Sequence, residues 1–103
     1  MPSKYVLNIY PLAQKDLDKI VHYIANDLAN PDAAQSLIDD FYSAFERILI
    51  FPSSCPFTND EFVKDSTLRK LIVKKYIAFY RVVDNEVQVV RVLYGMSNYQ
   101  ELL

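Results

Sequence analysis

Glycine, cysteine, histidine and tryptophan are almost absent from this chain of 103 residues. It has one glycine, one cysteine, one histidine and no tryptophan. A single glycine excludes the GxGxxG and P-loop phosphate cradles, because both need several glycines at fixed spacing. One cysteine and one histidine cannot build a zinc site of the usual Cys/His type, and a lone cysteine cannot form an internal disulfide. We therefore expect no cofactor and no metal.

Long apolar runs are also missing. No run approaches the roughly 20 residues that a membrane-spanning helix needs, and residues 1–10 show no charged region followed by a long apolar one. Together with the single cysteine, this pattern predicts a cytoplasmic protein without membrane contact. The length fits one domain, which we place at residues 1–103.

The few residues that often carry chemistry have ordinary structural interpretations. We interpret Cys55 as a small packed hydrophobe and His22 as a residue at the boundary of an apolar helix stripe, rather than as a nucleophilic pair. Asp39 and Asp40 are adjacent on a predicted helix and do not face each other, which is typical of a solvated surface. The pair at residues 60–61 lies in a predicted loop, where nothing specific supports cation binding.

Charge is distributed unevenly along the chain. Residues 1–61 carry four Lys/Arg and nine Asp/Glu, whereas residues 62–103 carry seven and four. The asymmetry indicates one basic face. The alternative is a sheet whose outer face is basic only for solubility.

The first half of the chain reads as a strand followed by two helices. Residues 4–10 alternate with the period of a strand, and residues 11–29 then place apolar side chains at three- and four-residue spacing. Residues 30–32, Asn-Pro-Asp, combine a helix cap, a first-position proline and an acidic first turn, and Pro52 stops this second helix. So short a connection predicts an antiparallel helical hairpin.

The second half reads as a loop and three strands. Phe57 and Phe62 are expected to pin the loop over residues 53–64 to the body. The strands, predicted over residues 69–75, 77–83 and 87–94, are separated by short turns and should form antiparallel hairpins. Simple alternation of the last strand puts four side chains on one face: Val87, Val89, Arg91 and Leu93.

Gly95 breaks this alternation, and its free backbone suits a turn. The tail from Met96 to Leu103 is expected to cover the edge of the sheet. The order β-α-α-β-β-β predicts an α+β fold, with a helical hairpin packed on a mainly antiparallel four-stranded sheet.

Basic and aromatic residues interleave in the predicted sheet. Such a mixture offers cations to phosphates and rings to unstacked bases, which favours contact with single-stranded nucleic acid. The alternative is that tyrosine is simply a good strand former. The residues concerned are Lys70, Lys74, Lys75, Tyr76, Tyr80, Arg81, Arg91, Tyr94 and Tyr99.

Several stretches together resemble the RelE/ParE superfamily of toxins, over nearly the whole chain. They are the first strand, the proline-opened helix with DLDKIVHYI at residues 16–24, the turn at 25–31 and the helix ending in ILIFP at 48–52. The strands contribute LRKL at 68–71, IAFYRV at 77–82 and RVLYG at 91–95. The order and spacing of these stretches carry the resemblance, and no single motif decides it.

The resemblance implies a growth-inhibiting toxin of a type II toxin–antitoxin pair. Such toxins are held inactive by a cognate antitoxin, whose C-terminal segment wraps the toxin, and operator DNA is bound only through the antitoxin. RelE-like members cleave mRNA in the ribosomal A site, and ParE-like members inhibit DNA gyrase. A third interpretation is an inactive toxin-like fold that serves only as the partner of an antitoxin-like repressor.

This chain departs from the RelE nuclease pattern. Lys70 matches one of the expected lysines, but Ile77 stands where an arginine is expected before Tyr80, and Ser97 where one is expected after the glycine. The His-Arg pattern of ParE is also altered, at residues 94–97. The long helical hairpin looks more like ParE, and we favour gyrase inhibition.

The resemblance also gives two sets of candidate site residues. As a nuclease, the chain would hold the scissile phosphate with Lys70, Arg81, Arg91 and Tyr99. The residues expected to bind the target are Arg69, Lys74, Lys75, Tyr94 and Ser97. For the antitoxin, we expect an apolar groove between the helical hairpin and the sheet, rimmed by Lys74, Lys75 and Arg81, that takes an amphipathic and partly acidic segment.

Overall fold

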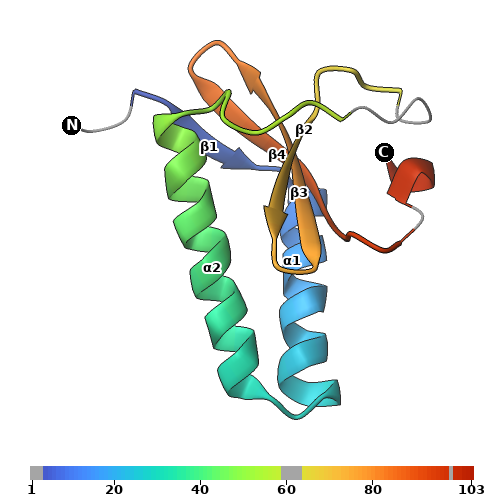
Figure 1. Cartoon of the computed structure of the whole chain (residues 1–103). Helices are drawn as coiled ribbons and strands as arrows, with labels where there is room; N and C mark the ends of the chain where they lie inside the picture. The colour runs from blue at the N-terminus through green and yellow to red at the C-terminus, as the bar shows by residue number, and fades with distance from the viewer. Residues whose placement is uncertain (1–3, 59–63, 98) are drawn as a thin grey trace.

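Two helices pack on one face of a four-stranded sheet (Figure 1). A computed structural model describes residues 4–58, 64–97 and 99–103 of the chain. Phe62 and the acidic pair at 60–61 lie outside these residues. The predicted order β-α-α-β-β-β and the α+β class are confirmed. The elements are β1 (Val6–Ile9), α1 (Pro11–His22), η1 (Tyr23–Asp27), α2 (Pro31–Ile50), β2 (Arg69–Val73), β3 (Tyr76–Val83), β4 (Glu86–Tyr94) and η2 (Tyr99–Leu102).

The starts of the helices follow the local signals. Pro11 is the first residue of α1, where its missing N–H costs nothing. Asn30 caps α2 by accepting a 3.1 Å hydrogen bond from the Ala33 N–H, and Asp32 lies in the first turn. The prediction of one regular α-helix over residues 11–29 was wrong at its end, because the chain from Tyr23 to Asp27 widens into a π-helical turn.

The strand order in the sheet is β1-β4-β3-β2. β2, β3 and β4 form antiparallel hairpins, and β1 pairs parallel with β4, so the sheet is mainly antiparallel as predicted. Both hairpin loops have two residues, and the first residue of each is left-handed, with φ of 52° at Lys74 and 54° at Asp84. Such a conformation is what tight hairpin loops require.

A β-bulge interrupts the β3–β4 hairpin at Val90. Phe79 pairs with Arg91, but Tyr80 pairs with Val89, so Val90 has no partner on β3. The extra residue shifts the alternation of β4 by one. Simple alternation was therefore wrong beyond this point: Val92, rather than Arg91, joins Val87 and Val89 in the core.

The main core lies between the helices and the sheet. Its largest fully buried side chain is Tyr80, whose hydroxyl donates a 2.7 Å hydrogen bond to the Pro52 carbonyl, just beyond the end of α2. Cys55 packs against this core, as expected of a small hydrophobe. The buried core residues are Ala13, Leu37, Phe41, Ala44, Phe45, Ile48, Leu71, Val73, Ala78, Tyr80, Val87, Val89 and Val92.

In the part of the chain that the structure describes, no helix is both long and apolar enough to cross a membrane.

Candidate functional site: the open face of the sheet and its flanking grooves

The sheet face opposite the helices, which we call the open face, has its own apolar cluster. Leu68, Ile77, Phe79 and Leu93 are buried there. The C-terminal segment η2 covers them, with the Tyr99 ring centroid 5.1 Å from that of Phe79. The prediction that the tail covers the edge of the sheet was wrong. The tail lies on the open face instead, because its apolar side chains pack against the apolar cluster there.

Arg81 organises a polar network on the open face. It donates to Asp65 at 2.9 Å, to Gln88 at 2.9 Å and to the Tyr10 hydroxyl at 3.2 Å. The Tyr10 hydroxyl in turn donates to Gln88 at 2.7 Å. The hydrogen bond to Tyr10, followed by the electrostatic interactions with Tyr10 and then Asp65, raises the pKa of Arg81. Hydrogen bonds from Thr67, with a smaller contribution from Arg81, lower the pKa of Asp65.

Arg91 forms the most buried ion pair that the described residues contain. It donates to both carboxylate oxygens of Asp16 on α1, at 2.7 and 3.0 Å, and only 16% and 11% of the two side chains are exposed. Asp16 also accepts the Val92 N–H at 3.0 Å, on a part of β4 that extends beyond β1. Arg91 further donates to the Leu102 carbonyl at 3.2 Å, so it joins α1, β4 and the tail.

The structure brings the predicted nuclease residues onto one face. Lys70 and Arg91 flank Phe79 in the register of the sheet, Tyr99 stacks on the same ring, and Arg81 lies on the same face of β3. Both arginines, however, are already paired with carboxylates. A scissile phosphate would have to displace Asp65 and Asp16 to reach them.

Four of the five predicted target-binding residues lie together at one end of the sheet, which we call the sheet tip. Lys74 and Lys75 form the β2–β3 turn, and the Lys75 carbonyl accepts a 2.8 Å hydrogen bond from Gly95, just beyond Tyr94. Ser97 follows in the turn after β4, donating to the Tyr94 carbonyl.

Arg69 does not belong to the sheet tip. It lies at the other end of β2, where it donates to the carbonyls of Ser53 and Cys55 and stacks on the Phe57 ring at 3.8 Å. This contact fixes the loop after α2, as was expected of Phe57. Gly95 lies in the turn after β4, as predicted, but its φ is not positive. Its need is space, because a Cβ would stand 3.2 Å from the Lys75 carbonyl.

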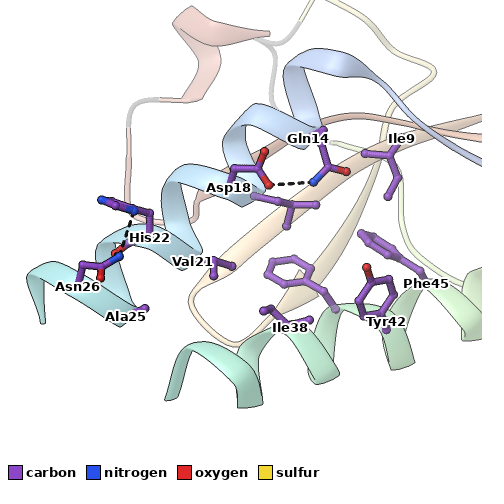
Figure 2. Close-up of a pocket in the computed structure, with 12 residues that line it drawn as sticks. Ile9, Gln14, Asp18, Val21, His22, Ala25, Asn26, Ile38, Tyr42 and Phe45 are labelled. Carbon is purple, nitrogen blue, oxygen red and sulfur yellow. Dashed lines mark hydrogen bonds between the residues drawn. The ribbon is translucent and has the colours of Figure 1, made fainter. Parts of the chain in front are cut away.

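A groove of about 390 Å³ lies between α1 and α2 (Figure 2). Val21 and Ile38 point toward each other across it. A row of hydrogen-bonded polar side chains on α1 and η1 borders it, with Gln14 joined to Asp18 and Asn26 to His22. The connected ends of the two helices extend beyond the β2–β3 turn (Figure 1). Sequence reasoning missed the groove, although the helix stripes are wider than a short sheet can cover. Its lining is Ile9, Gln14, Leu17, Asp18, Val21, His22, Ala25, Asn26, Ile38, Phe41, Tyr42 and Phe45.

Two adjoining hollows form a second groove between α2 and β2. Arg47, Ile50 and Ile72 line both of them. This is where the apolar groove between hairpin and sheet was expected. Lys74 lines it, whereas Arg81 lies on the open face in its network with Asp65. The other lining residues are Asp40, Ser43, Ala44, Glu46, Ile48, Phe51, Ser54, Cys55, Pro56, Lys70, Leu71 and Val73.

Within the described ranges, no three His, Cys, Asp or Glu side chains lie close enough together to hold a metal ion.

Comparisons with known proteins agree with this architecture. One structural relative is a chain of the chromosomal ParDE toxin–antitoxin system from P. aeruginosa, with a TM-score of 0.70 and 22% identity, covering 90% of this chain and 98% of that one. Another is a chain of the RelBE2 toxin–antitoxin complex from Mycobacterium tuberculosis, with a TM-score of 0.59 and 18% identity, covering 87% and 96%. No curated protein matches by sequence.

The family comparison goes further than the fold. The ParE toxin family of type II toxin–antitoxin systems (parDE) matches residues 7–99, which include every helix and strand of the sheet-and-hairpin body except the first residue of β1. The chain is therefore a toxin of a type II toxin–antitoxin system and belongs to the ParE toxin family.

Proposed function

We propose that this toxin arrests growth by binding DNA gyrase rather than by cleaving RNA, and that a cognate antitoxin holds it inactive in the cytoplasm. The observation that carries the proposal is the pairing of both candidate catalytic arginines with carboxylates. Arg91 is almost enclosed with Asp16, and Arg81 is held by Asp65 and Gln88.

RNA cleavage needs cationic side chains that are free to bind the negative charge that develops on the phosphate in the transition state. The transition state of phosphate transfer places extra charge on the phosphate oxygens, and preorganised donors aimed at that charge supply much of the rate. On the open face both guanidinium groups already face carboxylates, and Tyr99 is engaged by Phe79. An incoming phosphate would meet Asp65 and Asp16, whose like charge repels it.

The sheet tip is the surface we assign to the target. Lys75, Tyr94 and Met96 are exposed there, and the Tyr94 ring rests on Tyr76 with centroids 5.9 Å apart. Burial is the largest cause of the raised pKa of Tyr76, in agreement with its packing beneath the Tyr94 ring. Exposed aromatic, methionine and cationic side chains together are typical of protein-binding surfaces.

The antitoxin is assigned to the groove between α1 and α2. The groove is open along the helices, apolar at its floor and polar along its α1 border, as a site for one face of an amphipathic helix should be. Its position beside the core allows a partner to cover apolar side chains that the sheet leaves uncovered, such as Val21 and Ile38.

The first test is induced expression of the chain alone in bacteria, with DNA and protein synthesis labelled separately. We expect DNA synthesis to stop before protein synthesis, and co-expression of the product of the adjacent open reading frame to restore growth. Early arrest of protein synthesis with cleaved mRNA would overturn the proposal in favour of the ribosomal nuclease. Normal growth with folded protein present would overturn it in favour of an inactive partner.

The second test uses purified gyrase in a supercoiling assay. Lys75→Glu reverses an exposed charge at the sheet tip and should weaken inhibition by about tenfold, the loss of one good charged contact at an interface. Lys15→Glu makes the same change at an exposed position on α1 and is the matched control. Equal inhibition by the two variants would remove the sheet tip from the target surface.

A further inference from the structure

The groove between α1 and α2 carries a single full charge. Apolar side chains form its floor, Val21 and Ile38 among them. Its border on α1 and η1 consists of polar residues at intervals of four, namely Gln14, Asp18, His22 and Asn26. Among the described residues that line the groove, Asp18 is the only Asp, Glu, Lys or Arg.

The Asp18 carboxylate has one oxygen available to a partner. Its Oδ1 accepts a 3.0 Å hydrogen bond from Gln14 Nε2, and Figure 2 shows the two side chains joined on the α1 border. Within the described ranges, no hydrogen bond or ion pair engages its Oδ2. Lys15 and Lys19 lie close to Asp18 on α1, but neither lines the groove.

A helix laid in this groove would remove Asp18 from water. A carboxylate that is covered in this way loses hydration, and only a cation in good geometry compensates for the loss. Arginine can donate two hydrogen bonds to one carboxylate, and lysine supplies a compact ammonium group. A neutral side chain at the same place would leave the carboxylate unpaired, and an acidic one would repel it. The groove therefore discriminates among amphipathic helices by charge.

The same charge argues against a second copy of this chain as the occupant. A symmetric interface places the same surface of each copy against the other. Two copies that met through this groove would cover two Asp18 carboxylates, and the lining offers no lysine or arginine to pair with either.

We propose that Asp18 is the residue by which this toxin selects its antitoxin, and that the selected helix carries one arginine or lysine beside its apolar stripe, on the side that faces α1. The basic side chain pairs with Asp18 Oδ2 while the apolar stripe covers Val21 and Ile38. The inference rests on the proposed function in one respect, the assignment of the antitoxin to this groove. It adds the charge that separates the cognate helix from other helices with the same apolar stripe.

Charge reversal at Asp18 tests the proposal. Asp18→Lys should weaken the complex with the product of the adjacent open reading frame at least about thirtyfold in calorimetric titration, because it sets two cations against each other. Asp39→Lys is the matched control: Asp39 is exposed on α2, lies outside the groove lining, and accepts the same 3.0 Å bond from Gln35, four residues earlier. It should weaken the complex less than about threefold. Equal weakening by the two variants would overturn the proposal.

A compensating change in the antitoxin gives a result that a folding defect cannot imitate. Each lysine and arginine of the antitoxin is changed to glutamate in turn. One of these changes should weaken binding to the wild-type toxin and restore binding to Asp18→Lys to within about tenfold of the original pair. If no single change restores binding, the pair does not exist and the proposal fails.

A variant on the groove floor separates the failure of this inference from the failure of the proposed function. Ile38→Glu places a charge among apolar side chains and should weaken the complex whatever the charge pattern of the antitoxin. If Ile38→Glu has no more effect than Asp39→Lys, the antitoxin does not bind this groove and both proposals lose it. If Ile38→Glu weakens the complex while Asp18→Lys behaves like Asp39→Lys, the groove assignment stands and selection by Asp18 is overturned.

The gyrase assay completes this separation. A chain that depends on Asp18 for its antitoxin, yet does not inhibit gyrase, would overturn the proposed target and leave the inference about Asp18 standing.

Discussion

The helix-covered face and the open face of the sheet use the same strands but are stabilised by different interactions. On the helix side, the chain buries a continuous apolar core whose strand residues follow the alternation of the sequence, apart from the bulge. On the open face, a small apolar cluster is bordered by two arginine–aspartate pairs and covered by the tail. Stability therefore depends mainly on the helix side, and the two arginine charges on the open face are neutralised by carboxylates of the protein instead of being left for a ligand.

The largest loss of stability is expected when a large side chain is removed from the centre of the core on the helix side. Tyr80→Ala removes a fully buried ring and its bond to Pro52, and it should lower the free energy of unfolding by about 4 kcal/mol. Tyr80→Phe keeps the ring and should cost only about 1–2 kcal/mol. Urea denaturation followed by circular dichroism measures both. Similar losses in the two variants would mean that the hydroxyl, rather than the ring, stabilises this face.

Loss of Asp16 should have the next largest effect. Asp16→Ala leaves the Arg91 charge and the Val92 N–H without their partner, and it should cost about 3 kcal/mol because the pair is almost enclosed. Asp65→Ala breaks a pair whose side chains are 31% and 34% exposed, and it should cost at most about 1 kcal/mol. Denaturant unfolding of both variants compares the two pairs on the same face. Equal losses in the free energy of unfolding would show that burial does not determine the relative strengths of the two ion pairs.

A smaller effect is expected at the sheet tip. Gly95→Ala places a Cβ 3.2 Å from the Lys75 carbonyl, and the turn must open by a few tenths of an ångström to admit it. We expect a loss of about 1 kcal/mol in the free energy of unfolding. Met96→Ala, at a neighbouring residue that is 83% exposed, should change stability little and serves as the control. No difference between the variants would indicate that the contact relaxes without cost.

The smallest effect concerns pH. The folded state lowers the pKa of Asp65 below its ordinary value of 3.8, chiefly through the Thr67 hydrogen bonds. A lowered folded pKa stabilises the protein above the unfolded pKa, and this stabilisation is lost as the pH falls through the folded pKa. Between about pH 5 and pH 3, the wild type should therefore lose slightly more stability than Asp65→Asn. Thermal unfolding at both pH values measures this, and parallel pH profiles would argue against the lowered pKa.

Local signals in the sequence predicted the elements well because each depends on residues close together. The cap at Asn30, the proline at residue 31 and the stripe along α2 specify that helix without information from the rest of the chain. The hairpin order of β2, β3 and β4 follows from their short loops for the same reason.

Features that depend on distant residues could not be predicted. The bulge at Val90 moves Arg91 out of the core, where an arginine without a partner would be strongly destabilising, but alternation alone gives no sign of an extra residue. The partner of Arg91 is Asp16, which is far away in the sequence, so the sequence alone gives no sign that this arginine is neutralised. The candidate residues could thus be predicted from their residue types and from the face of the sheet on which they lie. Whether their side chains are free to bind a ligand depends on contacts that only the fold shows.

The parallel pairing of β1 with β4 has a consequence for the order of folding. Val6 pairs with Glu86 and Ile9 with Val89, so the first strand of the chain can pair only after the last strand, β4, has been synthesised. Contacts so far apart in the chain are slow to form, and the helical hairpin between them can assemble earlier from local contacts. A nascent toxin therefore presents its helices before its sheet is closed. An antitoxin that recognises the groove between α1 and α2 can engage the chain before the open face and the sheet tip are complete.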